Sequence, residues 1–214
     1  MVCTSNSQIA ISAHIPFFNK NNLPTNTKKA HSFFLSGPQA LHNALFQNNT
    51  PDYSAWNKLY SADLWKNKFF APRKFAEDLA TIPDILLNTN RIIITTQPLY
   101  FYRKRKDSLL NTPYNKEKTE LLEIAENLLE KISTKDKRLI PAAENTLLSA
   151  SFSILWKTPD TEEFSDVKKR AYKHILRLRF KSLFDTRTRF RNKAAVLFSL
   201  LGKRFLIFAL RRFG

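Results

Sequence analysis

The chain has 214 residues, of which 43% are hydrophobic and 25% charged, enough for one folded core or one domain with an appendage. Only 3 Gly and 1 Cys occur, which argues against a Gly-rich phosphate-binding loop and excludes a disulfide within the chain. The net charge of +17 lies mainly in residues 166–214, where Asp166 and Asp185 are the only acids. This asymmetry predicts an anionic partner, either a membrane or a nucleic acid.

Short β-prone pieces and helices alternate in the first part of the chain. In chain order the sequence predicts a β-prone piece within residues 2–13, a loop over 14–35, a helix over 36–48, and an extended piece over 55–65 that becomes helical near Ser61. The helix over 36–48 is expected because Pro38 follows Ser36 and Gly37 at a first-turn position.

Two acids, Glu77 and Asp78, stand together in the otherwise apolar stretch FAEDLATIPDILL. One interpretation is a helix start, because acids in a first turn meet the exposed N–H groups and the positive end of the helix dipole. The other interpretation is a catalytic base at the rim of a cleft. The helix is expected to reach about Asn88, with a kink or restart at Pro83, because proline removes one backbone hydrogen bond.

A β-hairpin is predicted over residues 91–106, RIIITTQPLYFYRKRK, because β-branched and aromatic residues flank Gln97-Pro98. From residue 117 onward the pattern is helical. The sequence predicts a first helix with a leucine-rich face, a second over about 137–156 with Pro141 in its first turn, a third from Thr158-Pro159, and a last one, AAVLFSLLGKRFLIFALRRF, interrupted by Gly202-Lys203-Arg204. The expected fold class is therefore α/β followed by a mainly α-helical C-terminal region.

Three motifs, AWNKLY at 55–60, AED at 76–78 and QPLYFYRKRKDSLLN at 97–111, stand in this order. Their order and intervals resemble family 2 glycosyltransferases, in the bacterial branch that builds surface polysaccharides and lipo-oligosaccharides. The resemblance covers roughly residues 1–115. It implies an inverting enzyme with a GT-A fold, which transfers a sugar from a nucleotide sugar to a growing glycan.

The resemblance also implies roles for individual residues. Asp78 would be the general base that deprotonates the acceptor hydroxyl, with Glu77 as its neighbour, because an ionised carboxylate can accept that proton as the new bond forms. Trp56 would be a platform for an acceptor sugar, and Asn57 and Lys58 would line the same cleft. The alternatives are a core tryptophan, a turn residue and a surface residue.

Arg103 and Arg105 would clamp a diphosphate leaving group, which suits the geometry of guanidinium groups. As alternate residues of a strand they are expected to point to one face. The alternative is an edge strand that is protected by charge. No metal ligands are predicted, because the four histidines are scattered and Asp160-Thr161-Glu162 opens a late helix, away from the other motifs.

The family's nucleotide-binding half, which ends in an Asp-x-Asp metal motif, has no counterpart in this sequence. We therefore expect an incomplete GT-A-like half with a short β-hairpin over residues 1–115, a helical extension over 116–157, and a basic amphipathic helical tail over 158–214. A divalent metal, Mn²⁺ or Mg²⁺, would be expected only with the donor half, which a separate chain could supply. The chain alone is expected to be inactive.

The alternative function is a non-enzymatic basic module that binds an anionic membrane through its C-terminal tail. Nucleic acid is the less favoured ligand, because the basic residues alternate with aliphatic ones rather than with exposed aromatic residues. No stretch reaches the roughly 18 apolar residues of a membrane span, and the start is not typical of a signal peptide. The expected location is the cytoplasm, peripheral to the inner membrane.

Overall fold

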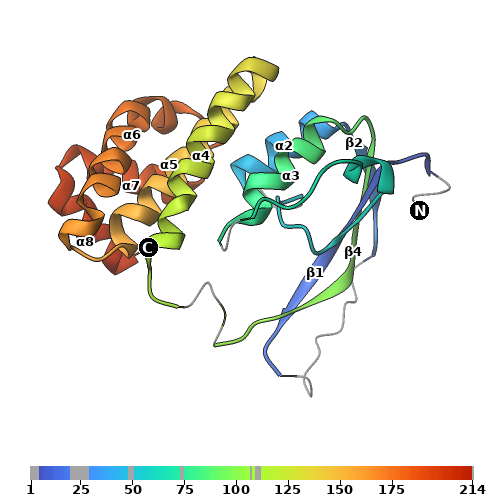
Figure 1. The fold of residues 1–214 in the computed structure, drawn as a ribbon, viewed down its shortest axis with the longest axis horizontal. Coiled ribbons are helices and arrows are strands. Elements are labelled where there is room, and N and C mark those ends of the chain that lie inside the picture. Colours follow the sequence, from blue (N-terminus) through green and yellow to red (C-terminus); the bar gives the residue numbers. More distant parts are fainter. Residues whose placement is uncertain are drawn as a thin grey trace.

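The computed structural model describes residues 5–19, 29–47, 51–72, 75–106, 108 and 112–213. A mixed four-stranded sheet with helices is followed by a mainly helical region (Figure 1), which confirms the predicted fold class. The N-terminal part comprises β1 (Ile9–Phe17), β2 (Ser32–Leu35), α2 (Gly37–Phe46), β3 (Lys58–Tyr60), the 3-10 helix η1 (Ala62–Trp65), α3 (Glu77–Leu87) and β4 (Ile92–Arg103). The C-terminal part comprises α4 (Lys116–Lys135), α5 (Ile140–Lys157), α6 (Ser165–Phe184), α7 (Phe190–Leu200) and α8 (Lys203–Phe213), with 3-10 turns at Lys137–Leu139 and Glu162–Phe164.

The sheet has the strand order β2-β4-β1-β3, with a parallel pair, β1 and β4, at its centre. The outer strands are antiparallel to their neighbours and short: β2 pairs with β4 as far as Thr95, and β3 pairs with β1 as far as Ile11. Beyond these points β1 and β4 continue side by side to Phe17 and Arg103 (Figure 1). The loop predicted over residues 14–35 thus contains the end of β1 and all of β2.

The hairpin predicted over residues 91–106 is instead the single strand β4, which continues through Gln97 and Pro98. Pro98 lies opposite Ala13, where the register between β1 and β4 shifts as in a β-bulge. Proline has no N–H group and is tolerated at bulges and at open edges. Since β2 no longer flanks β4 at this position, the missing donor breaks no pairing with β2. The turn signal therefore marks a bulge.

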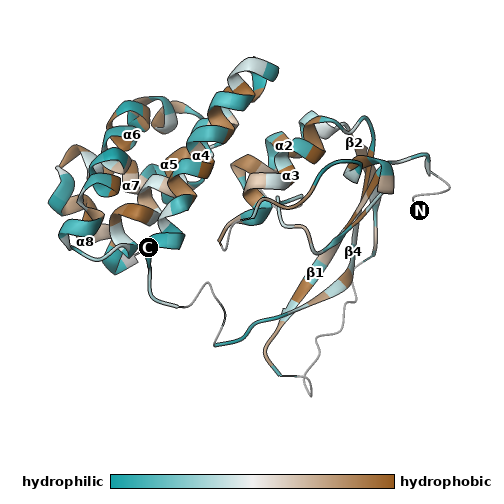
Figure 2. Ribbon diagram, in the orientation of Figure 1, coloured by the Kyte–Doolittle hydropathy of each residue, from teal (hydrophilic) through white to brown (hydrophobic). Residues whose placement is uncertain are grey.

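Helices α2 and α3 cover one face of the sheet. Ile9 and Ile11 of β1 and Ile92 and Ile94 of β4 are buried in the same core as the two helices, as the two-residue period of a strand requires. Figure 2 shows hydrophobic colour at the end of the sheet where all four strands pair. The helices contribute Leu41, Leu45, Phe46, Leu79, Ile82, Ile85 and Leu86. Each such side chain contributes roughly 1.5–3 kcal/mol when fully buried.

The start of α2 agrees with the sequence prediction and lies against the end of α3. Ser36 and Gln39 form a capping box, in which each side chain binds the other residue's backbone N–H. The N–H of Gly37 donates to the carbonyl oxygen of Thr89 at 3.0 Å. A Cβ atom at Gly37 would lie 1.9 Å from the carbonyl oxygen of Leu86, so only glycine fits this contact.

Helices α4 to α8 pack around a second core. The buried residues that share it include Leu122 and Ala125 of α4, Leu147, Phe152 and Leu155 of α5, Ala171, Ile175 and Leu178 of α6, Val196 of α7, and Leu206 and Leu210 of α8. The regions predicted as a helical extension over 116–157 and a basic tail over 158–214 therefore form one helical bundle.

Two boundaries in this bundle differ from the prediction. Thr158 is the C-cap of α5 and is buried, and α6 begins only at Ser165, after a 3-10 turn. The predicted last helix is divided into α7 and α8 at Gly202, whose φ of +101° favours glycine. This break lets both helices bury a side against the bundle.

Polar side chains join the bundle to the end of α2. Asn145 and Thr146 of α5 both donate to the backbone carbonyl of Leu45, at 3.0 Å and 3.1 Å. This carbonyl belongs to the last turn of α2, where the helix leaves acceptors unpaired. The guanidinium of Arg189 donates to the side-chain carbonyl of Gln47, the C-cap of α2. Cations are favourable at this end of a helix.

Candidate active site

Asp78 lies in the first turn of α3, so the helix-start interpretation of the acid pair is correct. The helix begins after Ala76, which adopts a left-handed conformation with φ of 58°, and continues through Pro83 without a restart. The carboxylate oxygen Oδ2 of Asp78 accepts a hydrogen bond from the backbone N–H of Ala55 at 3.2 Å. This bond joins the start of α3 to the segment before β3. The two motifs AED and AWNKLY therefore meet in space.

Asp78 is half-buried, and its surroundings raise the pKa of its carboxyl group. Burial is the largest cause, and the charges of Glu77 and Asp52 act in the same direction. The hydrogen bond from Ala55 and the charge of Lys58 oppose the shift but do not cancel it. A carboxylate with a raised pKa is a stronger base, which is what proton abstraction at neutral pH requires.

An ion pair with a buried ammonium group lies beside Asp78. The ammonium group of Lys58, at the start of β3, donates to Oδ1 of Asp52 at 3.1 Å, to the backbone carbonyl of Ser54 at 2.5 Å and to the side-chain carbonyl of Asn57 at 2.8 Å. Burial alone would raise the pKa of Asp52, but Lys58 and the hydrogen bonds from Ser54 hold it below its usual value. Burial lowers the pKa of Lys58, and the charges of Asp52 and Asp78 oppose that effect.

Asn57 is buried, and its side chain is occupied by two structural contacts. Its amide nitrogen donates to the backbone carbonyl of Ser12 at 2.8 Å, and its side-chain carbonyl accepts from Lys58. The backbone N–H of Ser12 donates in turn to the carbonyl of Asn57 at 3.1 Å. Asn57 thus fastens the segment before β3 to β1, and Lys58 is an internal counter-ion rather than a surface residue.

Trp56 belongs to an aromatic cluster on β1 and β4. Its ring stacks on Tyr102 with a centroid distance of 4.8 Å and an interplanar angle of 24°, and it lies 4.9 Å from the ring of Tyr100. The ring of His14 meets Trp56 edge-on at 4.8 Å. Trp56 remains half-buried, so it is neither a core residue nor a free platform. Its neighbours Tyr100 and Tyr102 come from the PLYFYR motif, so the AWNKLY motif contacts both of the other two.

The two arginines of the predicted diphosphate clamp are not placed alike. Arg103 is the last residue of β4 and is exposed, and Arg105 lies beyond the strand. The alternation that would point both side chains to one face therefore does not extend to Arg105. The charges that act on the pKa of Asp78 come from Glu77, Lys58 and Asp52. Neither arginine is among the charges that act on the pKa of Asp78.

No group of three or more His, Cys, Asp or Glu residues in the described ranges could hold a metal ion. Asp160, of the rejected Asp160-Thr161-Glu162 triplet, accepts hydrogen bonds from Lys168 and Arg211. It therefore links α6 and α8 to the end of α5.

Sequence analysis does not identify Asp52, Ser54, Tyr53 or Tyr60, which complete the site. Burial, and then the charges of Asp78 and Asp52, raise the pKa of Tyr60, and its hydroxyl donates to the carbonyl of Ala55 at 3.5 Å. The spacing of Asp52 and Ser54 is the one signal that could have shown part of this, since an Asp side chain often accepts from the backbone two residues on.

The sequence matches no protein-family model, and no curated protein matches it.

Proposed function

We propose that this protein is the acceptor-side half of a family 2-like glycosyltransferase and that Asp78 is its general base. The supporting observation is that one motif contacts both of the others. Asp78 from AED binds the backbone of AWNKLY, and Trp56 from AWNKLY stacks on Tyr102 of PLYFYR. A merely structural helix start would need neither the ion pair of the buried Lys58 with Asp52 at its side nor a carboxyl group with a raised pKa.

In the proposed reaction Asp78 accepts the proton of an acceptor hydroxyl as the oxygen bonds to the anomeric carbon of the donor sugar. The bond from that carbon to the nucleoside diphosphate breaks, and the configuration inverts. The charge of Glu77 contributes to the raised pKa of Asp78. The backbone N–H of Ala55 donates a hydrogen bond to Oδ2 of Asp78 and thereby fixes the direction of the carboxylate. The half-buried ring of Trp56 would contact the acceptor sugar.

The donor nucleotide and any Mn²⁺ or Mg²⁺ would be held outside the described residues, on a nucleotide-binding half with an Asp-x-Asp motif. A separate chain could supply this half. The acceptor would be a bacterial surface glycan, assembled at the cytoplasmic face of the inner membrane.

The test joins the full chain to the nucleotide-binding half of a characterised family 2 glycosyltransferase and measures release of nucleoside diphosphate with glycan acceptors. Asp78→Asn should lower the rate about 100-fold or more, the scale of a lost general base. Asp63→Asn is the control, because Asp63 pairs with Lys66 on the surface of η1. A variant Asp78→Asn that turns over at the unmodified rate would remove Asp78 from the mechanism.

A second candidate function, binding to an anionic membrane, is favoured by the surface of α7 and α8. Leu201, Phe205 and Phe208 are 64%, 57% and 66% exposed. Arg204 and Arg212 are exposed and lie one helical turn before and one turn after Phe208 in α8, so cations flank the two phenylalanines. Apolar side chains can enter the headgroup region while each cation near an anionic surface adds about 1 kcal/mol. Only the side of α8 that carries Phe205 and Phe208 can contact a membrane, because Leu206 and Leu210 on the other side are buried in the bundle.

None of the helices in the described part of the chain is both long and apolar enough to cross a membrane. Binding at the surface is measured by flotation with phosphatidylcholine vesicles, with and without phosphatidylglycerol. Phe205→Ser together with Phe208→Ser should weaken binding to the anionic vesicles about tenfold or more. Phe69→Ser, at an exposed phenylalanine of the N-terminal part, should have no effect. Equal effects of the two changes would exclude α8 as the binding surface.

A further inference from the structure

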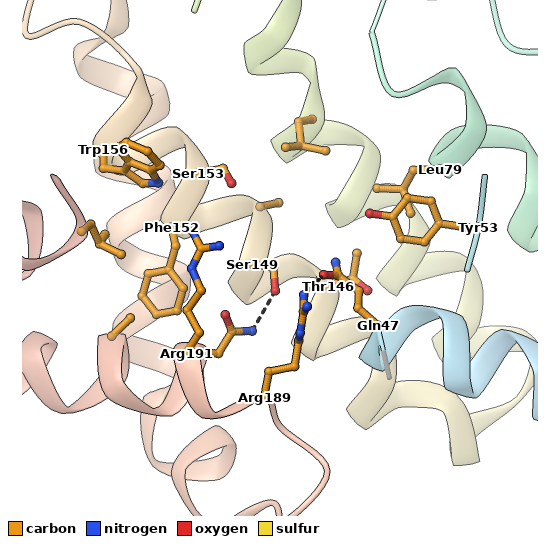
Figure 3. A pocket seen from close by; sticks show the side chains of 15 residues that line it. Gln47, Tyr53, Leu79, Thr146, Ser149, Phe152, Ser153, Trp156, Arg189 and Arg191 are labelled. Atoms are coloured by element: carbon orange, nitrogen blue, oxygen red, sulfur yellow. Dashed lines mark hydrogen bonds between the residues drawn. The ribbon is translucent and has the colours of Figure 1, made fainter. Parts of the chain in front are cut away.

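A cavity of about 160 Å³ lies between the N-terminal part and the helical bundle (Figure 3). Its walls come from α3, α4, α5, α7 and α8 and from the segments around Gln47 and Tyr53. Leu79, the residue after Asp78, also lines it. The volume corresponds to about five water molecules, which is enough for a phosphate or diphosphate group.

The charged groups of the cavity are all positive. Arg189 and Arg191 line it, and Figure 3 shows both side chains reaching from the start of α7 toward α5. Arg189 donates to Gln47, whereas Arg191 has no hydrogen bond or ion pair with any described residue. None of the residues that line the cavity is acidic. Two guanidinium groups thus face one cavity without a carboxylate to neutralise them.

The α5 wall presents a polar stripe. Thr146, Ser149 and Ser153 follow one another at a helical spacing, and Trp156 continues the same side of the helix. Most other residues of α5 are buried. The hydroxyl of Ser149 accepts from Asn192 at 2.8 Å, the bond drawn in Figure 3. The hydroxyl of Ser153 has no hydrogen-bond partner among the described residues, so it can donate to a ligand.

The pKa shifts around the cavity agree with an excess of positive charge there. Desolvation, and then the charges of Arg191 and Lys118, lower the pKa of Lys157 at the end of α5. The cations on this side of the bundle therefore repel one another. On the opposite side, burial and the charges of Asp52 and Asp78 raise the pKa of Tyr53, while Arg189 lowers it. Asp52 itself is neutralised by Lys58.

We propose that this cavity binds a phosphate or diphosphate ester, with Arg189 and Arg191 on its oxygens and Ser153 as a further donor. Arginine forms two parallel hydrogen bonds with such oxygens, and these charge-assisted bonds are stronger than neutral ones. The remaining walls, among them Leu121, Phe152 and Trp156, suit an apolar substituent of the ester.

The ligand would lie beside Leu79 and hence near Asp78, so it would be part of a phosphorylated acceptor. Only the assignment of the ligand to an acceptor rests on the proposed function. Binding of the anion can be measured without any transfer reaction, so failure of the anion site is distinguishable from failure of the proposed transferase function.

The experiment is calorimetric titration of the full chain with inorganic pyrophosphate. Arg189→Gln and Arg191→Gln should each weaken binding about tenfold or more, because each removes a charge-assisted hydrogen bond. Arg177→Gln is the matched control, since Arg177 is an exposed arginine of α6 outside the cavity. Circular dichroism and thermal melting check that all variants fold.

A vesicle arm distinguishes a lipid headgroup from a free ester. Phosphatidylcholine vesicles carry either phosphatidic acid, a phosphate monoester, or phosphatidylglycerol, a diester. If the ligand is a lipid, pyrophosphate and the two arginine changes will lower binding to phosphatidic acid more than binding to phosphatidylglycerol. If it is a free ester, only the soluble titration will depend on the arginines. No dependence on Arg189 and Arg191 in either arm would overturn the proposal.

Discussion

Replacing Asp52 with Asn should destabilise the protein by about 2–3 kcal/mol, because it removes the counter-charge of a buried ammonium group. The side chain of Lys58 is 0% exposed, and two of its three acceptors are uncharged, the backbone carbonyl of Ser54 and the side chain of Asn57. Breaking a fully buried pair costs roughly 3–5 kcal/mol. The side chain of Asp52 is 38% exposed, so water can replace part of the lost interaction, and we expect the smaller value.

The assay is urea unfolding at neutral pH, with the free energy of unfolding compared between variants at a common slope. Asp63→Asn is the control, because Asp63 and Lys66 are 73% and 76% exposed and water screens the interaction of such a pair. Adding Lys58→Met to Asp52→Asn should recover part of the lost stability, since no buried charge then remains without a partner. Equal losses for Asp52→Asn and Asp63→Asn would refute the reasoning.

Three further predictions concern single positions. Gly37→Ala should destabilise the fold by about 1–3 kcal/mol, because the added Cβ would overlap the carbonyl oxygen of Leu86; chemical denaturation measures this. Gly202→Ala should cost about 1–2 kcal/mol from backbone strain alone, because nothing lies within 4 Å of the added atom; an unchanged free energy of unfolding would contradict this. Asp78→Asn should raise the melting temperature at pH 7. The folded-state pKa of Asp78 lies above its ordinary 3.8, so the stability from this group is complete below that value and declines as the pH rises through the folded-state pKa. The gain should therefore disappear in acid, and a gain that persists there would exclude titration of Asp78 as the cause.

The parts of the fold that sequence analysis predicts are those with local signals. The capping box at Ser36 and the first-turn Pro141 of α5 are read directly from neighbouring residues. The errors arise where a local signal depends on its surroundings. Gln97-Pro98 is typical of a turn, but the open side of β4 permits a bulge there. Thr158 is typical of a helix start, but it closes the preceding helix.

The candidate site shows the same division. Asp78 stands out from the chain because an acid pair is unusual in an apolar segment, and the order of motifs adds Trp56 and Lys58. The contacts that give these residues their properties are not visible in the sequence. Asp52 neutralises Lys58 only because the segment before β3 folds back, and Arg189 approaches Gln47 across 142 positions of the chain. No periodicity or propensity encodes such pairings.

The parallel pairing of β1 with β4 has a consequence for synthesis of the protein in the cell. Phe17 at the end of β1 pairs with Arg103, which is made 86 positions later, and β2, α2, β3 and α3 all lie between them. At translation rates of about 5–20 residues per second, β1 waits roughly 4–17 s for its partner. During this time its apolar residues and unpaired edges are open to chaperones and to aggregation. The bundle of α4 to α8, with contacts between successive helices, should form much faster once its last helix emerges. Conditions that slow the ribosome between β1 and β4 should therefore reduce the yield of folded sheet far more than slowing it within the bundle.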